Sequence, residues 1–272
     1  MAAKSLPALR VIDPVWTQIR AESERLVDSE PALASFVYAS VLSHARLEDV
    51  VINRVAAHLD HGDVSGELIR RVYEQALDDD PAIGDDFRAD IQAVFDRDPA
   101  CDRMIPPVLY FKGFAALQTH RLAHWLWTHD RRDFACYLQA RSSIVFAVDI
   151  HPAARIGRGV MLDHATGFVA GETTVIEDDV SILQGVTLGG TGKDCGDRHP
   201  KIRRGVMIGA GASVLGNIEV GAGARIAAGS VVLREVPAGK TVAGVPAKIV
   251  GDAGTQPAYA MDQVFDVFDP GI

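Results

Sequence analysis

The stretch KIRRGVMIGAGASVLGNIEVGAGARIAAGSVV, residues 201–232, carries an aliphatic residue at every sixth position. Glycine and alanine cluster just after many of these positions. A period of six fits neither a helix nor a simple hairpin array, but it suits a β-helix whose short faces meet at tight corners. The stretch therefore predicts a coil of short strands with the aliphatic side chains stacked inside. The repeated positions are Ile202, Ile208, Val214, Val220, Ile226 and Val232.

The same period extends upstream, with two interruptions. Phe168 and Ile176 are eight residues apart, and Leu188 and Ile202 are fourteen apart. The longer interval contains TGKDCGDRHPK, residues 191–201, which we expect to leave the coil as a polar loop. Its cations and histidine would suit a carboxylate or a phosphate. The upstream positions in the period are Ile150, Ile156, Leu162, Phe168, Ile176, Ile182 and Leu188.

The first half of the chain predicts helices. In LEDVVINRVAAHL, residues 47–59, apolar residues recur at spacings of three and four, which is typical of one helical face. Residues 106–130 favour one long helix whose tryptophans pack against another layer. His120 and His124 have the spacing of a metal-binding pair. With no third ligand nearby in the sequence, we expect them to form a pair on the helix surface.

These patterns predict an α+β organisation. An all-helical domain over residues 1–144 precedes a coiled β domain over residues 145–250, and residues 251–272 form a flexible tail. The formal net charge of −9 argues against nucleic-acid binding. Three widely spaced cysteines without a CxxC pair suit a reducing cytoplasm. No stretch resembles a signal peptide or reaches about 18 apolar residues, so we expect a soluble, cytoplasmic protein that does not enter a membrane.

One corner of the predicted coil carries unusual residues, in GVMLDHATGFVAGET, residues 159–173. Asp163 and His164 follow the interior position Leu162, where β-helix stability requires no histidine. A neutral imidazole can accept a proton at cellular pH, so we interpret His164 as a general base. Asp149 is the candidate orienting partner. In an ideal repeat the two are offset by about three residues, roughly 10 Å, so either the first coil is irregular or the contact crosses a subunit boundary.

The repeat resembles that of the hexapeptide-repeat acyltransferases. This resemblance implies a left-handed parallel β-helix, trimeric assembly, and active sites in the clefts between neighbouring β-helices. The likeness narrows at DRDPACDR, residues 96–103, at DIHPAARIGRGVMLDHATG, residues 149–167, and at GDRHPKIRRGV, residues 196–206. These segments resemble the serine O-acetyltransferases, which make O-acetylserine for cysteine synthesis and whose N-terminal helices pack two trimers into a hexamer.

The resemblance implies a role for each matching residue. His164, with Asp149 as its partner, would deprotonate the hydroxyl of L-serine as it attacks the thioester carbonyl of acetyl-CoA. No acyl-enzyme would form, so Cys195 need not be a nucleophile. The substrate-binding residues would be Asp98 and Asp163 for the ammonium group, and Arg198 and His199 for the carboxylate. Contacts to CoA would come from Gly190, Ala210, Ala228 and Lys248.

The resemblance also implies ligands and partners. Acetyl-CoA would be a co-substrate, with no permanently bound cofactor and no metal, and L-cysteine would compete with L-serine as a feedback inhibitor. The chain ends FDVFDPGI, residues 265–272, like the family tail that inserts into O-acetylserine sulfhydrylase. Gly271 and Ile272 would be the anchor, and Pro270 departs from the family pattern and would stiffen the tail. The alternative is a terminus with no partner.

Three other functions stay open on the sequence. A hexapeptide transferase acting on a sugar or an antibiotic would keep His164 but would not need charges matched to a zwitterion. A carbonic anhydrase on the same fold would need three histidines around zinc, for which His151, His164 and His199 are available. An inert coil that only binds a partner through its tail would leave the polar loop unexplained.

Overall fold

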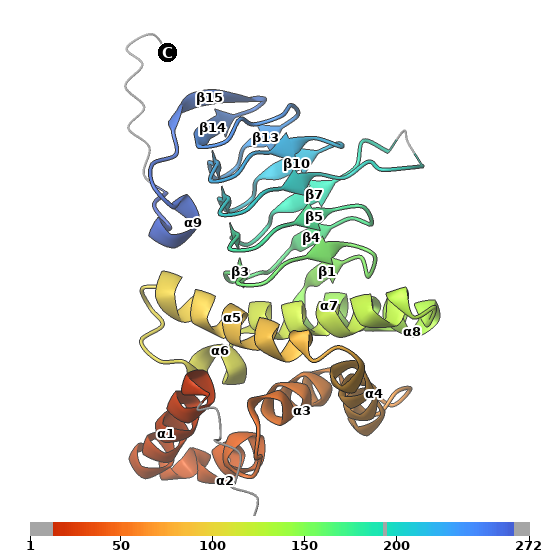
Figure 1. The fold of residues 1–272 in the computed structure, drawn as a ribbon, viewed down its shortest axis with the longest axis vertical. Coiled ribbons are helices and arrows are strands. Elements are labelled where there is room, and N and C mark those ends of the chain that lie inside the picture. The colour runs from red at the N-terminus through yellow and green to blue at the C-terminus, as the bar shows by residue number, and fades with distance from the viewer. Residues whose placement is uncertain (1–12, 193–194, 264–272) are drawn as a thin grey trace, which may run out of the picture.

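The helical first half and the coiled second half are stacked end to end (Figure 1), which confirms the predicted fold class. The computed structural model describes residues 13–192 and 195–263. Its N-terminal part contains α1 Pro14–Ser29, η1 Pro31–Leu33, α2 Ala34–Val37, η2 Tyr38–Leu42, α3 Leu47–Leu59, α4 Gly66–Asp79, α5 Ala82–Arg97, α6 Ile105–Leu109, α7 Lys112–Thr128 and α8 Arg132–Phe146.

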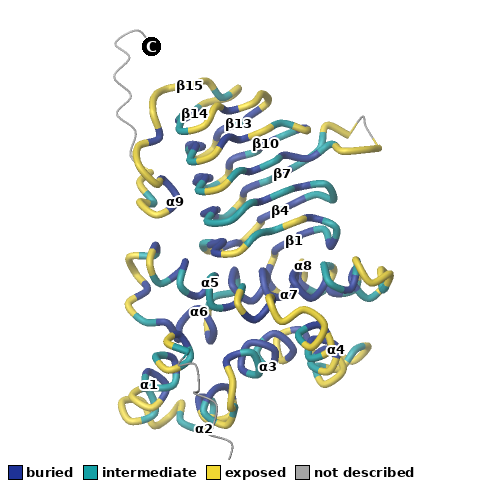
Figure 2. The backbone as a smooth tube through the Cα atoms, viewed as in Figure 1, coloured by how far each residue is buried: buried dark blue, intermediate teal, exposed yellow. Residues whose placement is uncertain are grey.

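The helix predicted over residues 47–59 is α3, but the single helix predicted over residues 106–130 is wrong. Phe111 has an extended backbone, with φ −87° and ψ 110°, and separates α6 from α7. The break brings Phe111 against a cavity described below. His120 was expected on a helix surface but is only 5 % exposed, because α7 is enclosed between the other helices and the first coil (Figure 2).

Short parallel strands form the three faces of the coil. Face A stacks β1 Val148–Ile150, β4 Phe168–Ala170, β7 Thr187–Gly189, β10 Ser213–Leu215 and β13 Val231–Val232, which makes about five turns. Face B stacks β2 Arg155–Ile156, β5 Val175–Ile176, β8 Lys201–Ile202 and β11 Glu219–Val220. Face C stacks β3 Met161–Leu162, β6 Ser181–Ile182, β9 Met207–Ile208, β12 Arg225–Ile226 and the antiparallel hairpin of β14 Lys240–Gly244 and β15 Ala247–Asp252.

Each face contributes a column of apolar side chains to the interior, as the period predicts. All of these side chains are buried except Ile156, which is half-buried. Strand register gives Ile150, Ala170, Leu188, Val214 and Val232 on face A. The columns on the other faces are Ile156, Ile176, Ile202 and Val220, and Leu162, Ile182, Ile208, Ile226 and Val242.

The pairing of β1 with β4 shows that the first interruption of the period lies before Phe168 rather than after it. Phe168 pairs with Val148 rather than Ile150, so Ala170 takes the place in the column that Phe168 was expected to fill. The two extra residues therefore lie between Leu162 and Ala170, in the corner that joins β3 to β4. The polar loop between β7 and β8 is confirmed where the fourteen-residue interval predicts it.

A buried ion pair holds the helices against the first coil. Asp90 of α5 is completely buried, and its Oδ2 accepts a hydrogen bond from Arg121 Nη2 of α7 at 2.7 Å. Arg121 Nη2 also donates to the Gly157 carbonyl at 3.0 Å, and Asp90 Oδ1 accepts from the Val160 N–H at 3.1 Å. This network holds the middle of α5 against Val160, the residue before β3.

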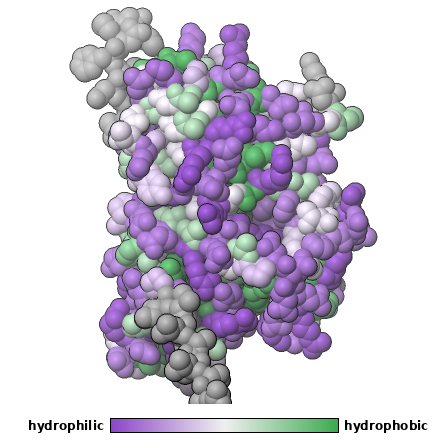
Figure 3. All heavy atoms as spheres, viewed as in Figure 1, coloured by the Kyte–Doolittle hydropathy of each residue, from purple (hydrophilic) through white to green (hydrophobic). Residues whose placement is uncertain are grey.

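The face drawn in Figure 3 is mostly hydrophilic, with hydrophobic residues in small separate patches. Among the helices of the described residues, none has the length and apolar character needed to cross a membrane.

Candidate functional site

The corner between β3 and β4 presents His164 to solvent. His164 and Ala165 both adopt the left-handed backbone conformation, with φ 53° and 56°. The corner is closed by hydrogen bonds from the Ala165 N–H to the Asp163 carbonyl and from the Thr166 N–H to the His164 carbonyl, at 2.5 and 2.7 Å. Backbone strain of this kind, about 1–3 kcal/mol per residue, gathers at functional sites. The His164 side chain is 73 % exposed, whereas that of Asp163 is 23 % exposed.

A cavity of about 440 Å³ opens beside this corner, between α5, the start of α7 and β3. Asp98, Asp163 and His164 are among the residues that line it. Asp98 is the C-cap of α5, and its Oδ1 accepts a hydrogen bond from the Ala100 N–H at 2.8 Å. The apolar wall includes Val94, Phe111, Phe114 and Met161.

Two carboxylates, those of Asp98 and Asp163, face this cavity, and Lys112 also lines it. Burial raises the pKa of the Asp163 carboxyl. His164 opposes that shift, since its Nε2 lies 3.9 Å from Asp163 Oδ1, whereas the Asp98 carboxylate adds to it. Two carboxylates that face one partly desolvated space repel each other. A bound ammonium group would relieve both the repulsion and the lost hydration.

Arg198 and His199, at the end of the polar loop, are both held by Thr173. The Thr173 hydroxyl oxygen accepts hydrogen bonds from the backbone N–H groups of Arg198 and His199, at 3.0 and 3.1 Å. It lies 2.9 Å from His199 Nδ1, which also accepts from the Thr173 N–H at 3.2 Å. Because Nδ1 accepts a hydrogen bond from the Thr173 N–H, it carries no proton of its own. We therefore assign the proton of the neutral His199 ring to Nε2, which makes Nε2 a hydrogen-bond donor.

The surroundings of His199 keep the ring neutral and fix where it lies. Burial lowers the pKa of His199, and the neighbouring Arg198 guanidinium lowers it further. A side chain at Gly171 would place its Cβ 2.0 Å from His199 Nε2. Glycine is therefore required at position 171 if the imidazole is to keep this position.

Other polar groups gather near His199 at the same edge of the coil. Arg198 Nη2 donates to Glu172 Oε2 at 2.7 Å. Burial lowers the pKa of His151, and the Arg198 guanidinium lowers it further, whereas the carboxylates of Glu172 and Asp149 oppose this shift. The four side chains are therefore close enough to interact electrostatically. Asp149 Oδ1 accepts a hydrogen bond from Gln139 Nε2 of α8 at 2.7 Å.

The predicted site residues therefore lie in two groups within one chain. His164 occupies the corner between faces C and A, whereas Arg198 and His199 precede β8 at the corner between faces A and B. Asp149 lies on face A between them. Three residues of strand span about 10 Å, and among the hydrogen bonds and ion pairs of the described residues none joins Asp149 to His164.

The predicted CoA contacts also divide. His164, Gln184, Ala210 and Ala228 occupy equivalent positions in successive corners, because the strands before them are in register. The corners are linked by hydrogen bonds of 2.8 Å from the Gly211 N–H to the Gln184 carbonyl and from the Gly229 N–H to the Ala210 carbonyl. They form a column that begins at His164 and runs through Gln184 to Ala210 and Ala228, which we call the C–A column.

The two other predicted CoA residues lie off this column. Lys248 is exposed on β15, in the hairpin that closes the end of face C. Gly190 follows face A, and a Cβ there would lie 3.2 Å from Arg198 Cγ.

Sequence reasoning missed the residues that support the predicted ones. Gly171, Glu172 and Thr173 lie 25 or more positions from Arg198 and His199, and only the stacking of coils brings them together. Gln139 lies ten positions from Asp149, and the packing of α8 on β1 joins them. The repeat itself held one signal, since Gly171 and Thr173 flank the same corner as the polar loop. Among the described residues, no group of three or more histidine, cysteine or acidic side chains could hold a metal ion.

A coil of hexapeptides with an exposed histidine at one corner is typical of the hexapeptide transferases. Residues 199–234 match the family model described as bacterial transferase hexapeptide (six repeats). Residues 15–119 match the model described as serine acetyltransferase, N-terminal.

Similar proteins agree with both models. The chain is 57 % identical to the serine acetyltransferase of Salmonella typhimurium and 56 % identical to that of Escherichia coli K12, in each case over 256 residues and 94 % of both chains. A serine acetyltransferase from Brucella abortus solved in complex with coenzyme A is 59 % identical, with a TM-score of 0.88 over 89 % of this chain and 97 % of that one. A serine acetyltransferase solved in complex with cysteine is 53 % identical, with a TM-score of 0.91 over 92 % of this chain and 98 % of that one.

The chain belongs to the serine acetyltransferase family. It is an enzyme that transfers the acetyl group of acetyl-CoA to serine, in cysteine biosynthesis.

Proposed function

We propose that the enzyme acetylates L-serine by general-base catalysis at His164, in a site that two neighbouring copies complete. His164 takes the proton of the serine hydroxyl, the oxygen attacks the thioester carbonyl, and CoA leaves as the thiol, giving O-acetyl-L-serine. The observation that carries this proposal is an exposed imidazole on a strained corner, at the mouth of a cavity with two carboxylates.

Direct transfer without an acyl-enzyme is supported by the cysteines. Cys101 packs with Val94 and Met161 beside the cavity, and burial raises the pKa of its thiol to about 11, so it stays protonated. A protonated thiol is a poor nucleophile. Cys136 and Cys195 are exposed on α8 and on the polar loop, away from the corner of His164.

The serine zwitterion would be held at both ends. Asp98 and Asp163 would take the ammonium group, and Arg198 and the Nε2–H of His199 would take the carboxylate. Arg198 would then share its guanidinium between Glu172 and the substrate.

Because these groups lie at opposite edges of face A, we propose that one copy supplies His164 and the next supplies Arg198, His199 and Asp149. A head-to-tail arrangement of this kind closes into a ring, and a trimer is the state that the resemblance implies. Leu33 and Tyr38, exposed at the outer end of the helical layer, support pairing of two trimers into a hexamer.

Acetyl-CoA would lie along the C–A column with its thioester at His164, as a co-substrate and not a permanent cofactor. The coenzyme A complex of the Brucella abortus relative supports this binding. L-cysteine carries the same ammonium and carboxylate groups as serine and would compete for the same charges as a feedback inhibitor, in line with the relative solved with cysteine.

Two proposals rest on the sequence. Gly271 and Ile272, which lie outside the described residues, would anchor the tail in O-acetylserine sulfhydrylase. The free thiols of Cys101, Cys136 and Cys195 support a reducing, cytoplasmic location.

The test measures thiol release from acetyl-CoA with L-serine, L-homoserine or a simple sugar as acceptor. We expect serine-dependent release to fall by about 10²–10⁴ in His164→Ala, the usual contribution of a general base. His61→Ala, at an exposed histidine in the loop before α4, should match the wild type. Wild-type activity in His164→Ala would remove the proposed base, and turnover with a sugar alone would contradict serine as the acceptor.

A further inference from the structure

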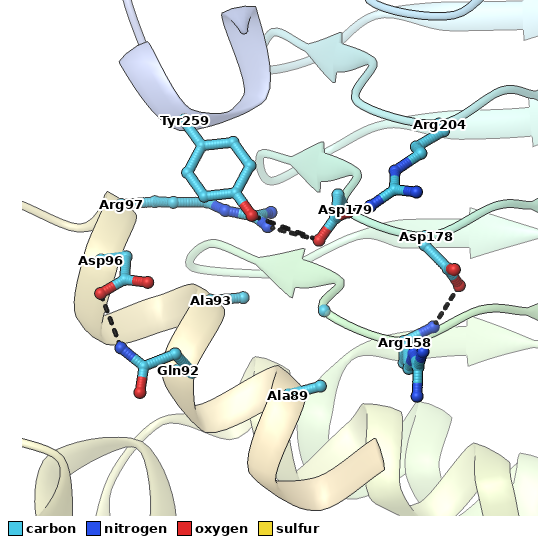
Figure 4. A pocket seen from close by; sticks show the side chains of 11 residues that line it. Ala89, Gln92, Ala93, Asp96, Arg97, Arg158, Asp178, Asp179, Arg204 and Tyr259 are labelled. Atoms are coloured by element: carbon cyan, nitrogen blue, oxygen red, sulfur yellow. Dashed lines mark hydrogen bonds and ion pairs between the residues drawn. The ribbon is translucent and has the colours of Figure 1, made fainter. Parts of the chain in front are cut away.

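The C-terminal end of the described chain lies in the angle between α5 and the coil (Figure 4). It forms the short helix α9, Pro257–Ala260, whose Ala258 carbonyl accepts a hydrogen bond from Ser181 Oγ of β6 at 2.8 Å. The Tyr259 hydroxyl donates to Asp179 Oδ1 at 3.3 Å. Tyr259 and Arg97, the last residue of α5, both line a cavity of about 270 Å³.

The ring of Tyr259 covers a buried cation. The Arg97 guanidinium carbon lies 4.2 Å from the ring centroid, and Arg97 is only 3 % exposed. Its Nη1 donates to Ser181 Oγ at 3.1 Å and its Nη2 to Asp179 Oδ1 at 3.3 Å. An aromatic face attracts a desolvated cation more strongly than an exposed one. The position of Arg97 therefore depends on α9 on one side and on the coil on the other (Figure 4).

Arg97 is the last residue of α5, and the next residue is Asp98, which lines the cavity beside His164. The Asp98 N–H bonds to the Val94 carbonyl at 2.9 Å, so the backbone of Asp98 follows the last turn of the helix. Met261, just after α9, packs against the apolar cluster of Val94, Cys101 and Met161. The C-terminal segment thus holds the turn that carries Asp98 through both a polar and an apolar contact.

We infer that Tyr259 and Arg97 are positioning residues for the amine of the acceptor: α9 clamps Arg97, and Arg97 sets where Asp98 stands in the cavity. The inference rests on the proposed role of Asp98 as a ligand of the serine ammonium group. Neither Tyr259 nor Arg97 lines the cavity of His164. Loosening the clamp should therefore weaken serine binding and leave acetyl-CoA binding unaffected.

Steady-state kinetics of the full chain test this inference. In Tyr259→Leu the KM for serine should rise about three- to tenfold, because the ring that holds Arg97 is lost. The kcat and the KM for acetyl-CoA should stay close to those of the wild type. Tyr259→Phe keeps the ring over Arg97 and should restore the serine KM.

Phe134→Leu is the matched control, because Phe134 also covers an arginine, Arg131, at 5.7 Å, but on α8 and away from Asp98. It should leave the KM for serine unchanged. A parallel fall of kcat and rise of both KM values in Tyr259→Leu would indicate general destabilisation and would overturn the inference.

A double-mutant cycle with Asp98→Asn separates this inference from the proposed function. If the clamp acts through Asp98, Tyr259→Leu should raise the serine KM no further in the Asp98→Asn background. An equal rise in both backgrounds would refute the clamp. If Asp98→Asn raises the serine KM but Tyr259→Leu does not, only the clamp is overturned. If Asp98→Asn keeps the wild-type serine KM, the role of Asp98 is overturned and the inference with it.

Discussion

Thr173 links the two residues proposed to bind the serine carboxylate. Its hydroxyl accepts from two consecutive backbone N–H groups and also lies 2.9 Å from His199 Nδ1. The hydroxyl therefore holds the path of the polar loop at Arg198, and together with the Thr173 N–H it holds the ring of His199. We therefore expect Thr173 to be a sensitive position for the proposed serine binding, although it is not itself charged.

Replacing Thr173 by valine keeps the shape of the side chain and removes these hydrogen bonds. We expect Thr173→Val to raise the KM for serine about tenfold, the effect of losing roughly 1.4 kcal/mol of hydrogen bonding, with a smaller change in the KM for acetyl-CoA. Steady-state kinetics with each substrate varied would measure this split. Thr173→Ser restores the hydroxyl and should recover most of the affinity, so equal defects in both variants would contradict the assignment.

Asp163 predicts a dependence of stability on pH. Its pKa in the folded enzyme is raised mainly by burial, so the unfolded chain, with an aspartate pKa of about 3.9, loses this proton first as the pH rises. As the pH rises from about 3.9 to the raised pKa of the folded enzyme, the free energy of unfolding decreases. Above the raised pKa it decreases no further on account of Asp163. Asp163→Asn removes the ionisation and should be more stable than the wild type at neutral pH.

Thermal unfolding measures this difference. Asp163→Asn should raise Tm by about 2 °C at pH 7, and the gain should disappear as the pH falls toward about 4. Its serine KM should rise in the same preparation. Asp102→Asn is the control, because the Asp102 side chain is 86 % exposed; an equal gain there would rule out burial as the cause.

At the scale of elements, the coil is stable only as a stack. Its strands are mostly two or three residues long, and each coil buries its apolar side chains against its neighbours. Ile208 is fully buried in the middle of the face C column, between Ile182 and Ile226. Its removal leaves a cavity that the adjacent coils cannot close.

We therefore expect Ile208→Ala to lower the free energy of unfolding by about 2–5 kcal/mol. Ile249→Ala on β15, where the isoleucine is 56 % exposed, should change it by less than about 0.5 kcal/mol. Denaturant titration of both variants measures the difference. Equal effects at the two positions would mean that the column does not dominate the stability of the coil.

For the whole molecule, the proposed function makes assembly part of the chemistry, because the two charged groups lie at opposite edges of face A. If each site takes His164 from one copy and Arg198 from the next, His164→Ala and Arg198→Ala chains should complement each other. Co-expressed mixtures should recover about a quarter of wild-type activity, as random association in a closed ring requires. Acetyl-CoA thiol release from purified mixtures would measure it, and mixtures as inactive as the separate variants would place both halves of the site in one chain.

Patterns local in the sequence predicted local structure well. The stripe over residues 47–59 matches α3, and the fourteen-residue interval matches the polar loop. Errors arose where long-range packing decides: Phe111 breaks a helical pattern to reach the cavity, and His120 is enclosed by elements distant in the chain. The eight-residue interval was assigned after Phe168, because periodicity alone cannot tell which apolar residue, Phe168 or Ala170, continues the column.

The sequence by itself determined the coil and the helical layer, and it contains the residue types that suit a general base and a zwitterion. A six-residue period can be read directly from the order of residues in the chain. The chemical character of each side chain likewise does not depend on the fold. Only the tertiary structure decided the widened, strained corner of His164, the support of His199 by Thr173 and Gly171, and the clamp of Tyr259 on Arg97. Those contacts join segments that lie up to 162 positions apart in the chain, and they exist because stacking of coils and docking of α9 bring such segments together in space.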